Sequence, residues 1–334
     1  MKNINILSNE DVSFVFKQYS ENIFPSEFKF FYNSKENIIW DLVIVYEEID
    51  TIYTLKCKKG ATMFFSGEPP ICKIYSKKFT EQFSHIISSH RNLLHPSNHL
   101  LQQSLLWYFG YNFEKKIVTY NFDDLIDLPN HKTKNISFIT SSRAFLPGHK
   151  ARLRFLKEVQ QRYESEIDFF GAGISYVADK ADAILPYRFS ICIENCNIPD
   201  YWSEKIADAI LGYSIPIYCG CNNIEDYFPQ ESFIKLDIND IDSSLSIIEY
   251  VIKNAEAIYK EKYPYLLKAR EKLLYQYNIF SSAIEYYNRF LSKKDDIEEI
   301  CIKPSSSFKD NLVKTFLLKL KRFCGKRVSV NNML

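Results

Sequence analysis

The chain has 334 residues, of which 46% are hydrophobic and 16% aromatic. A chain of this length and apolar content can bury two cores, so two domains of roughly 150 residues each are expected. Its 42 Lys and Arg residues against 41 Asp and Glu residues leave a formal net charge of +1. No overall positive field would therefore draw the protein onto nucleic acid, and nucleic acid is excluded as the expected partner.

Targeting and metal-binding patterns are not found. The segment MKNINILSNEDVSF (1–14) has no apolar core of signal-peptide length, and no stretch has the roughly 18 consecutive apolar residues of a membrane span. This predicts a cytoplasmic protein. The eight cysteines include no pair with the spacing of a zinc knuckle, and the histidines between residues 85 and 99 do not share one helical face. We expect buried free thiols and no metal site.

Short apolar runs occur through the first third of the chain, at 28–32, 41–46, 61–65 and 83–88. Continuous apolar runs of this length are typical of buried parallel strands. The polar segment DDLIDLPNHKTK (123–134) follows them and contains a proline. We place the boundary between two domains in this segment.

The second part of the chain alternates strands with helices. The predicted strands are 135–140, 167–171, 188–194 and 214–220, and the predicted helices are 150–163, about 203 to 211, and several through 241–292. Alternation at this spacing predicts right-handed βαβ units and a parallel sheet. The expected fold class is therefore α/β, with two Rossmann-like domains facing each other across a cleft. We divide the chain into 1–130, 131–295 and a C-terminal tail, 296–334.

Polar side chains gather where the predicted strand 188–194 ends and the next helix begins: Glu194, Asn195, Asp200, Tyr201, Glu204 and Lys205. Ligands of open α/β sheets bind at this edge, where helix N-termini present free N–H groups. Either Asp200 or Ser203 can cap the helix. Lys205 in the first turn opposes the helix dipole, and a bound anion would remove that conflict. Asp200 and Glu204 can also be explained simply as acidic residues that complement the dipole.

Two adjacent segments resemble the donor-binding signature of the glycosyltransferase family that contains the α-1,3/4-fucosyltransferases: YRFSICIENCNIPDYWSEKIADAILGYSIPIYCG (187–220) and NNIEDYFPQESFIKLDI (222–238). The signature combines Tyr-Lys-Phe, Glu-Asn, Tyr-x-Thr-Glu-Lys, a strand that ends in Gly, and a closing Ser-Phe-Ile. The matching residues are Tyr187, Phe189, Glu194, Asn195, Tyr201, Glu204, Lys205, Pro216, Gly220, Ser232, Phe233 and Ile234. Arg188 replaces the usual Lys, and Ser203 replaces the usual Thr.

Two outlying segments are similar to the same family. In SSRAFLPGHKARLRFLKEV (141–159), the arginine that opens the family's next helix aligns with Arg152, or in another register with Arg154. The segment MFFSGEPPICKIY (63–75) resembles a strand of the family that ends in Gly-Glu. In the family, this glutamate is the catalytic base. Glu68 is the candidate here. The two prolines after it support a loop at this position, because each lacks a backbone donor and restricts the preceding residue.

The resemblance implies an inverting α-1,3-fucosyltransferase of the GT-B fold. It would move L-fucose from GDP-fucose to a saccharide hydroxyl of a surface glycan or lipopolysaccharide-type acceptor, without a metal or another cofactor. Glu68 would be the general base in an acceptor-binding N-terminal domain. The donor would be held by Arg152, Glu194, Asn195, Tyr201, Glu204 and Lys205, with Arg152 and Lys205 against the diphosphate. A transferase for a different GDP-sugar, and a non-catalytic saccharide- or nucleotide-binding protein of the same fold, are alternatives.

The tail carries a separate signal. Residues 310–327, DNLVKTFLLKLKRFCGKR, repeat apolar side chains at helical spacing among Lys and Arg residues. Such a helix can lie on an anionic membrane surface, or it can pack its apolar stripe against the two domains. The first possibility would make the protein peripheral to the inner face of the membrane.

Overall fold

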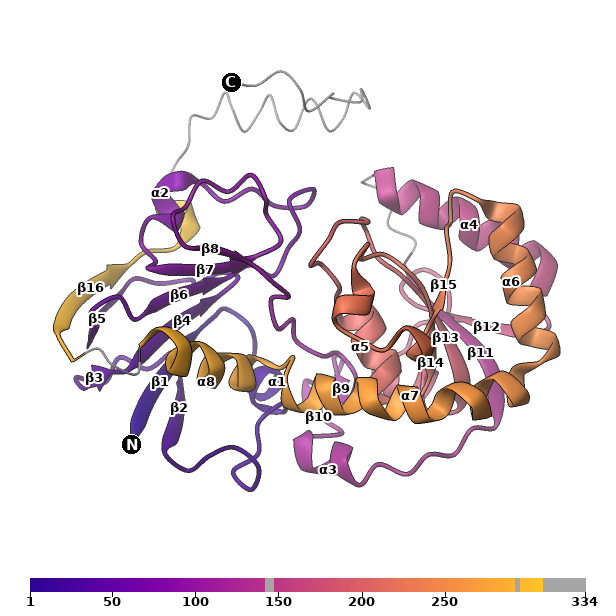
Figure 1. Cartoon of the computed structure of the whole chain (residues 1–334), viewed down its shortest axis with the longest axis horizontal. Coiled ribbons are helices and arrows are strands. Elements are labelled where there is room, and N and C mark those ends of the chain that lie inside the picture. Colours follow the sequence, from indigo (N-terminus) through magenta and orange to yellow (C-terminus); the bar gives the residue numbers. More distant parts are fainter. Residues whose placement is uncertain (142–146, 292–294, 309–334) are drawn as a thin grey trace, which may run out of the picture.

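The computed structural model describes residues 1–141, 147–291 and 295–308, and Figure 1 shows two α/β halves side by side. Each half contains one parallel sheet. The strand order is β2-β1-β4-β6-β7-β8 in the N-terminal sheet and β12-β11-β13-β14-β15 in the C-terminal sheet. Neighbouring parallel strands must be joined by crossover connections, as in Rossmann-like domains.

The N-terminal sheet contains every strand that the apolar runs predict, together with β1 and β8. Its strands are β1 (Lys2–Leu7), β2 (Phe28–Tyr32), β4 (Leu42–Tyr46), β6 (Thr62–Phe65), β7 (His85–Ser88) and β8 (Asn98–Leu100), all paired in parallel. The apolar pattern does not predict β1 because asparagines interrupt it. One of these, Asn5, is buried and exchanges hydrogen bonds with the backbone of Ser34.

Two elements from the end of the chain pack on this N-terminal half. Helix α8 (Ile279–Phe290) places the ring of Phe280 4.9 Å from that of Phe30, and Tyr286 lies edge-on to Phe65. Strand β16 (Ile297–Ile302) pairs antiparallel with β5 (Tyr53–Lys58), which also pairs with β3 (Ile39–Trp40). The sequence predicted α8 as part of the C-terminal domain and β16 as part of the basic tail. Both assignments are corrected, because α8 completes the aromatic core of the N-terminal half and β16 pairs with β5 of that half.

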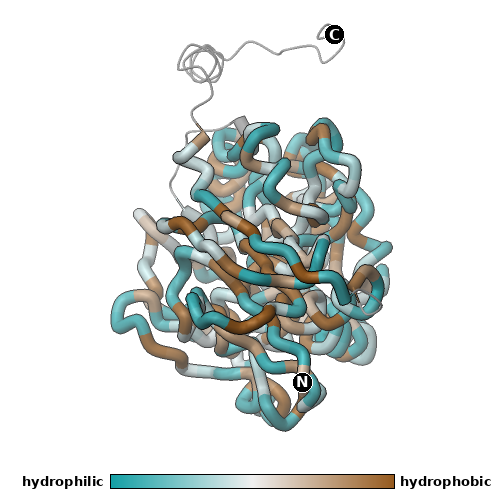
Figure 2. The backbone as a smooth tube through the Cα atoms, turned by 90° about the vertical axis from the view of Figure 1, so that its left-hand side faces the viewer, coloured by the Kyte–Doolittle hydropathy of each residue, from teal (hydrophilic) through white to brown (hydrophobic). Residues whose placement is uncertain are grey.

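The C-terminal half follows the predicted alternation. Its strands are β11 (Lys134–Ile139), β12 (Ile167–Phe170), β13 (Tyr187–Ile193), β14 (Ile215–Cys219) and β15 (Ile234–Lys235), and its helices are α4 (Pro147–Tyr163), α5 (Glu204–Leu211), α6 (Ile241–Lys253) and α7 (Ala255–Tyr275). Strands β13 and β14 are buried along their lengths apart from one position. Figure 2 shows the N-terminal half, where apolar stretches cross the middle and hydrophilic loops surround them.

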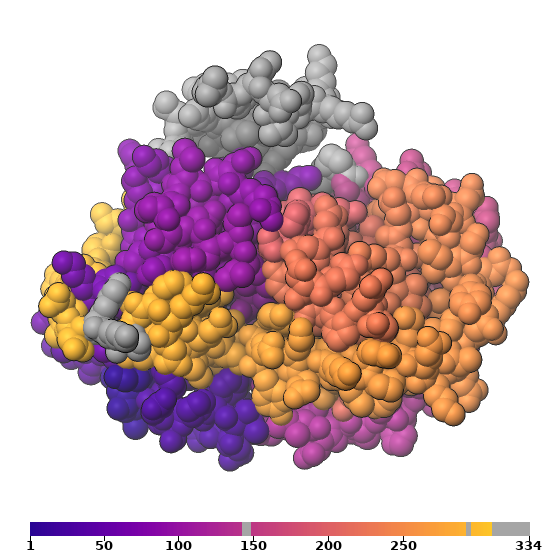
Figure 3. Space-filling model, in the orientation of Figure 1, coloured from indigo at the N-terminus to yellow at the C-terminus, as the bar shows by residue number. Residues whose placement is uncertain are grey.

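The two halves are joined by two connections. One is residues 101–133, with the hairpin β9 (Tyr111–Asn112) and β10 (Ile117–Val118) and helix α3 (Phe122–Ile126). The other is the α7–α8 junction, which crosses the seam between the halves in Figure 3. Arg270 of α7 is buried and donates to the carbonyl oxygens of Leu211 and Leu125. Because Leu125 lies in α3 and Leu211 in α5, Arg270 links α3 of the first connection both to α5 and to α7.

The carboxyl ends of the two parallel sheets face each other. Arg91, which follows β7, forms a 2.7 Å ion pair with Asp200, which follows β13. Loops at the carboxyl ends of parallel strands are the usual ligand-binding positions of α/β folds. The two Rossmann-like domains therefore face one another across a cleft, as the sequence predicts.

None of the described helices is both long and apolar enough to cross a membrane. The segment 310–327 lies outside the described residues. Its contact with an anionic membrane surface therefore stays a prediction, as does a cytoplasmic location.

Replacement of Arg270 tests the tie between the two connections. We expect Arg270→Met to lower the free energy of unfolding by about 1–3 kcal/mol, because two buried carbonyl oxygens lose their donors. Urea denaturation measures this loss. Lys268→Met, two residues away on the exposed face of α7, is the matched control and should cost much less. Equal effects of the two substitutions would contradict the structural role of Arg270.

Candidate active site

Glu194 lies directly after β13 and organises the turn into α5. Its carboxylate accepts hydrogen bonds from the backbone N–H of Ser203 at 2.8 Å and from the Ser203 hydroxyl at 2.7 Å. The Ser203 Oγ in turn accepts from the N–H of Lys205, so Ser203 is the N-cap. Only 2% of Glu194 is exposed. Glu194 is thus a buried bridge between the strand end and the helix cap.

Lys205 forms the centre of an ion-pair cluster at the start of α5. Its Nζ lies 3.2 Å from both Glu194 and Glu204 and 2.9 Å from the Ser203 Oγ. Burial would lower the pKa of Lys205, but the two carboxylates raise it above its ordinary value. Burial likewise opposes ionisation of Glu204, yet Lys205 and Lys180 lower the pKa of Glu204 to about 2. Both groups are therefore charged at neutral pH.

Lys180 and Asp208 extend this cluster, although no pattern in the sequence predicted their part in it. The Lys180 Nζ lies 2.8 Å from the Asp208 carboxylate and 3.6 Å from that of Glu204. Asp208 also accepts the backbone N–H groups of Tyr108 and Phe109, at 2.9 and 3.0 Å. The connection between the domains is thereby fixed to α5. An acidic residue one turn after Glu204, among the apolar residues of α5, is the signal in the sequence that could have indicated this contact.

Arg152 approaches the same strand end from α4. It is 4% exposed, and its guanidinium donates to the Asn195 Oδ1 at 2.9 Å and to the backbone and hydroxyl oxygens of Ser141. The Arg152 Nε is buried and has no acceptor among the described residues. Arg154, the alternative in the other register, is exposed.

The start of α4 lies very close to the end of β13. A Cβ atom at Gly148 would lie only 2.1 Å from the backbone oxygen of Asn195. Only a glycine allows this approach, because any side chain would collide with the strand end. Two helix starts, those of α4 and α5, therefore converge on Glu194 and Asn195.

Asp200 joins the domains and does not cap α5. Its backbone has a φ of 65°, and its carboxylate accepts from Arg91, Asn223 and Tyr227 at 2.7–2.9 Å. The alternative in which Asp200 caps the helix is therefore wrong, because its carboxylate is already used by three donors. Tyr201, which follows it, is 4% exposed.

Glu68 follows β6 on the opposite side of the cleft. Its side chain is exposed, while its backbone is held at both polar groups. The carbonyl oxygen accepts from the His90 Nε2 at 2.8 Å, and the backbone N–H donates to the Glu47 carboxylate at 3.2 Å. Glu47 also accepts from the backbone N–H of Gly67 and from the side chains of Lys73 and Tyr75. The Glu68 loop is thus anchored by side chains from two neighbouring strand ends.

The sequence did not predict that Glu47 and His90 hold the Glu68 loop. Glu47 directly follows the buried strand β4, and its φ of 58° is rare for a non-glycine residue. A charged residue at the end of an apolar run was visible in the sequence, but its partners 20 or more residues away were not. The contacts depend on the order of the strands in the sheet.

Although the residue is exposed overall, nearby protein atoms displace part of the water around the Glu68 carboxylate and raise its pKa, and the negative charge of Glu47 raises it further. The thiol of Cys72 and the charge of Lys205 act in the opposite direction. Glu68 belongs to the N-terminal half and Lys205 to α5, so this electrostatic contact crosses the cleft. The charges of Glu68 and Lys205 thus interact between the two halves.

Metal-binding groups are absent from the described part of the chain, where no three His, Cys, Asp or Glu side chains gather closely enough to hold an ion. The histidines make other contacts. His85 and His99 share a 3.2 Å hydrogen bond, and His95 contacts the backbone oxygen of Phe83.

The geometry is that of two facing Rossmann-like domains with a charged cluster at the carboxyl end of the C-terminal sheet. Residues 129–282 match the family model described as "Glycosyltransferase family 10 (fucosyltransferase) C-term". This segment of the chain is therefore similar to the C-terminal part of glycosyltransferase family 10.

Relatives agree with this assignment over short segments. The chain is 33% identical over 76 residues to "Alpha-(1,3)-fucosyltransferase FucT" of Helicobacter pylori, which is 22% of this chain and 16% of that protein. It is 30% identical over 132 residues to "4-galactosyl-N-acetylglucosaminide 3-alpha-L-fucosyltransferase 9" of Bos taurus, which is 38% of this chain and 34% of that protein. The matched segments thus span about a sixth to a third of these relatives.

Solved structures align over more of the chain at lower identity. An α1,3-fucosyltransferase with GDP-fucose aligns with a TM-score of 0.48 and 15% identity, covering 89% of this chain and 93% of that chain. An α-glucosyltransferase with UDP-glucose and DNA aligns with a TM-score of 0.49 and 9% identity, covering 88% and 100%.

The lowered pKa of Glu204 predicts how acid affects stability. Between pH 4.5 and about 2 the unfolded chain binds a proton at this residue and the folded chain does not. The stabilisation is thus present above pH 4.5 and is lost as the pH falls to 2. We expect Glu204→Gln to flatten this loss by up to about 3 kcal/mol, measured by urea unfolding at stepped pH.

The exposed Glu231 provides the control for this experiment. Glu231→Gln should leave the dependence of the unfolding free energy on pH as in the unmodified protein. An unchanged dependence in Glu204→Gln would show that the pair with Lys205 does not stabilise the fold.

Proposed function

We propose that the protein is an inverting α-1,3-fucosyltransferase that moves L-fucose from GDP-fucose to a saccharide hydroxyl of a surface glycan or lipopolysaccharide-type acceptor. One observation carries the proposal. The charge of Glu68 in the N-terminal half interacts with that of Lys205 in α5, which lies in the segment matched by the family 10 model. A proton acceptor on one side and cations on the other are what the transfer of a sugar from a nucleotide requires.

Glu68 is the proposed general base. It would take the proton of the acceptor hydroxyl while that oxygen attacks the anomeric carbon from the face opposite the diphosphate. The bond from the anomeric carbon to the phosphate oxygen would break, and GDP would leave with the electron pair, so the configuration inverts. A raised pKa suits this role, because a base works best when its pKa is closer to the working pH.

The donor side would stabilise the negative charge on the leaving GDP. Arg152 supports this role because its Nε is a buried donor without an acceptor among the described residues. Lys205 contributes positive charge, although Glu194 and Glu204 already share it. The N-termini of α4 and α5 add backbone donors and a partial positive charge. Asn195 and Tyr201 would help to shape the donor site. These groups supply charge stabilisation without a metal ion or another cofactor.

Two alternatives are tested by the same experiments. A different GDP-sugar would use the same diphosphate and guanosine contacts, so a donor screen separates it from GDP-fucose. A non-catalytic saccharide- or nucleotide-binding protein would bind GDP without turnover. The anchored loop of Glu68 favours the enzyme, because a binding protein has no need for a held carboxylate with a raised pKa.

Glu68→Gln tests the base directly. We expect transfer from GDP-fucose to fall about 10²- to 10⁴-fold, because Gln keeps the shape but cannot accept the proton. GDP affinity by calorimetry and the melting temperature should stay close to those of the unmodified protein. Glu81→Gln, at an exposed residue of the same domain, is the matched control and should keep full activity. Transfer by Glu68→Gln above roughly a tenth of the control rate would falsify the assignment.

Guanosine and diphosphate recognition are tested together. We expect GDP, but not UDP or CMP, to raise the melting temperature, with about 2.7 kcal/mol of stabilisation at 100 times its Kd. Arg152→Met should weaken GDP binding by about 1.5–3 kcal/mol, since a charged hydrogen bond is lost. Arg154→Met, exposed on the same helix, should not.

Three results would contradict this account of the donor site. Equal thermal shifts with UDP would remove the guanosine assignment. Equal GDP affinity in the two arginine variants would remove Arg152 from the site. Activity that is lost on chelation and restored by a divalent ion would reject the metal-free mechanism.

A further inference from the structure

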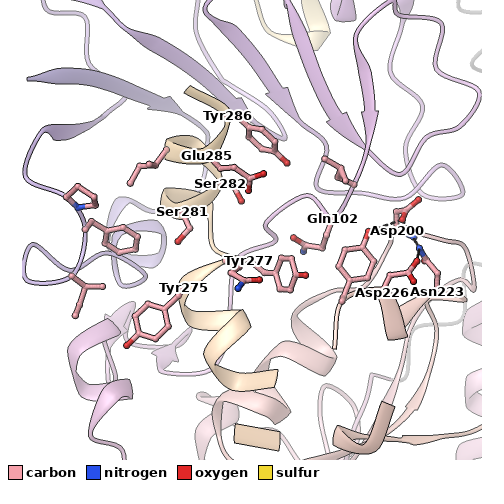
Figure 4. A pocket seen from close by; sticks show the side chains of 17 residues that line it. Gln102, Asp200, Asn223, Asp226, Tyr275, Tyr277, Ser281, Ser282, Glu285 and Tyr286 are labelled. Carbon is pink, nitrogen blue, oxygen red and sulfur yellow. Dashed lines mark hydrogen bonds between the residues drawn. The ribbon is translucent and has the colours of Figure 1, made fainter. Parts of the chain in front are cut away.

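A cavity of about 750 Å³ lies between the two domains, away from Glu68 and Lys205. Figure 4 shows its walls, which come from the segment after β8, from the loops after β13 and β14, and from the α7–α8 junction. The polar side chains that line it include Gln102, Asp200, Asp226, Tyr277, Ser282 and Glu285. The mechanism proposed above uses none of them.

Gln102 is an unsatisfied donor in the wall of this cavity. The residue is 4% exposed, and its Oε1 accepts from the backbone N–H of Ser104 at 2.6 Å. The Nε2 has no acceptor among the described residues. Figure 4 shows Gln102 on the cavity wall between Tyr277 and Asp200. Buried donors are normally paired, so this amide is a position where a ligand oxygen would gain a hydrogen bond.

The charges around the cavity restrict the ligand. Three carboxylates line it, those of Asp200, Asp226 and Glu285, and no Lys or Arg is found among the described lining residues. The Arg91 that pairs with Asp200 does not line the cavity. A phosphate or sulfate would be repelled here. Carboxylates, amides and hydroxyls beside tyrosine rings suit the hydroxyl groups and apolar faces of a neutral sugar.

We propose that this cavity is a second binding site, for a neutral oligosaccharide, distinct from the reaction centre. The choice of a saccharide rests on the proposed function. Asp200 connects the two places, because it lines the cavity and directly precedes the segment that leads to the cap of α5. From the N-terminal half, Gln103 donates to the Asp200 carbonyl oxygen at 3.0 Å. An occupant would thus contact both domains and favour this relative arrangement.

Binding of the full chain to an array of immobilised neutral and sialylated or sulfated oligosaccharides tests the site. Gln102→Leu removes the unpaired donor, and Glu285→Ala removes an exposed carboxylate of α8. Glu261→Ala, exposed on α7, is the matched control. Glu68→Gln is included because it disables the reaction centre alone.

We expect the unmodified protein, Glu261→Ala and Glu68→Gln to bind the same neutral glycans. Gln102→Leu and Glu285→Ala should bind them about tenfold or more weakly, while the thermal shift with GDP stays unchanged. The proposal is overturned if no neutral glycan binds, if the anionic glycans are preferred, or if both cavity variants bind as the control does. Cavity-dependent binding without any sugar transfer would reject the proposed function and keep the site. Transfer without cavity-dependent binding would reject the second site and keep the proposed function.

Discussion

The carboxylate of Glu194 is buried at the end of β13, and the C-terminal side of the cleft is built around it. A buried carboxylate is tolerated only when donors and opposite charges surround it, and Ser203 and Lys205 supply both. The same contacts fix where α5 begins and hold the Lys205 ammonium at the mouth of the cleft. Asn195, one residue further, positions Arg152. A strand end, a helix cap and two cations are therefore set by two consecutive residues.

A second anchored carboxylate governs the opposite side. Glu47 binds the backbone of the Glu68 loop, and its negative charge raises the pKa of the carboxylate that it positions. One residue thus holds the Glu68 loop in place and adds to the raised pKa of Glu68, of which burial is the first cause. The ion pair between Arg91 and Asp200 holds the two domains so that these arrangements face each other. Geometry and charge on both sides of the cleft depend on contacts between distant strand ends.

The sequence predicted those parts of the structure that depend on local pattern. Apolar runs located most strands, and the crowding of polar groups after β13 located the charged cluster at the start of α5, because helix caps and strand ends have local signals. Strand β1 was missed because its buried Asn5 is satisfied only by Ser34, far along the chain. The assignment of α8 failed for the same reason, since its aromatic partners are more than 200 residues away. Glu47 could not be connected to Glu68 before the strand order was known.

The dependence of kcat/KM on pH for transfer from GDP-fucose tests the central claim most directly, because it reports the basic group of the free enzyme. Activity should fall on the acidic side with a midpoint above 4.5, the ordinary pKa of a glutamate, since burial and Glu47 raise the pKa of Glu68. In Glu47→Gln, which removes the negative charge, the midpoint should move to lower pH. A midpoint at or below 4.5, or the same midpoint in both proteins, would contradict the account.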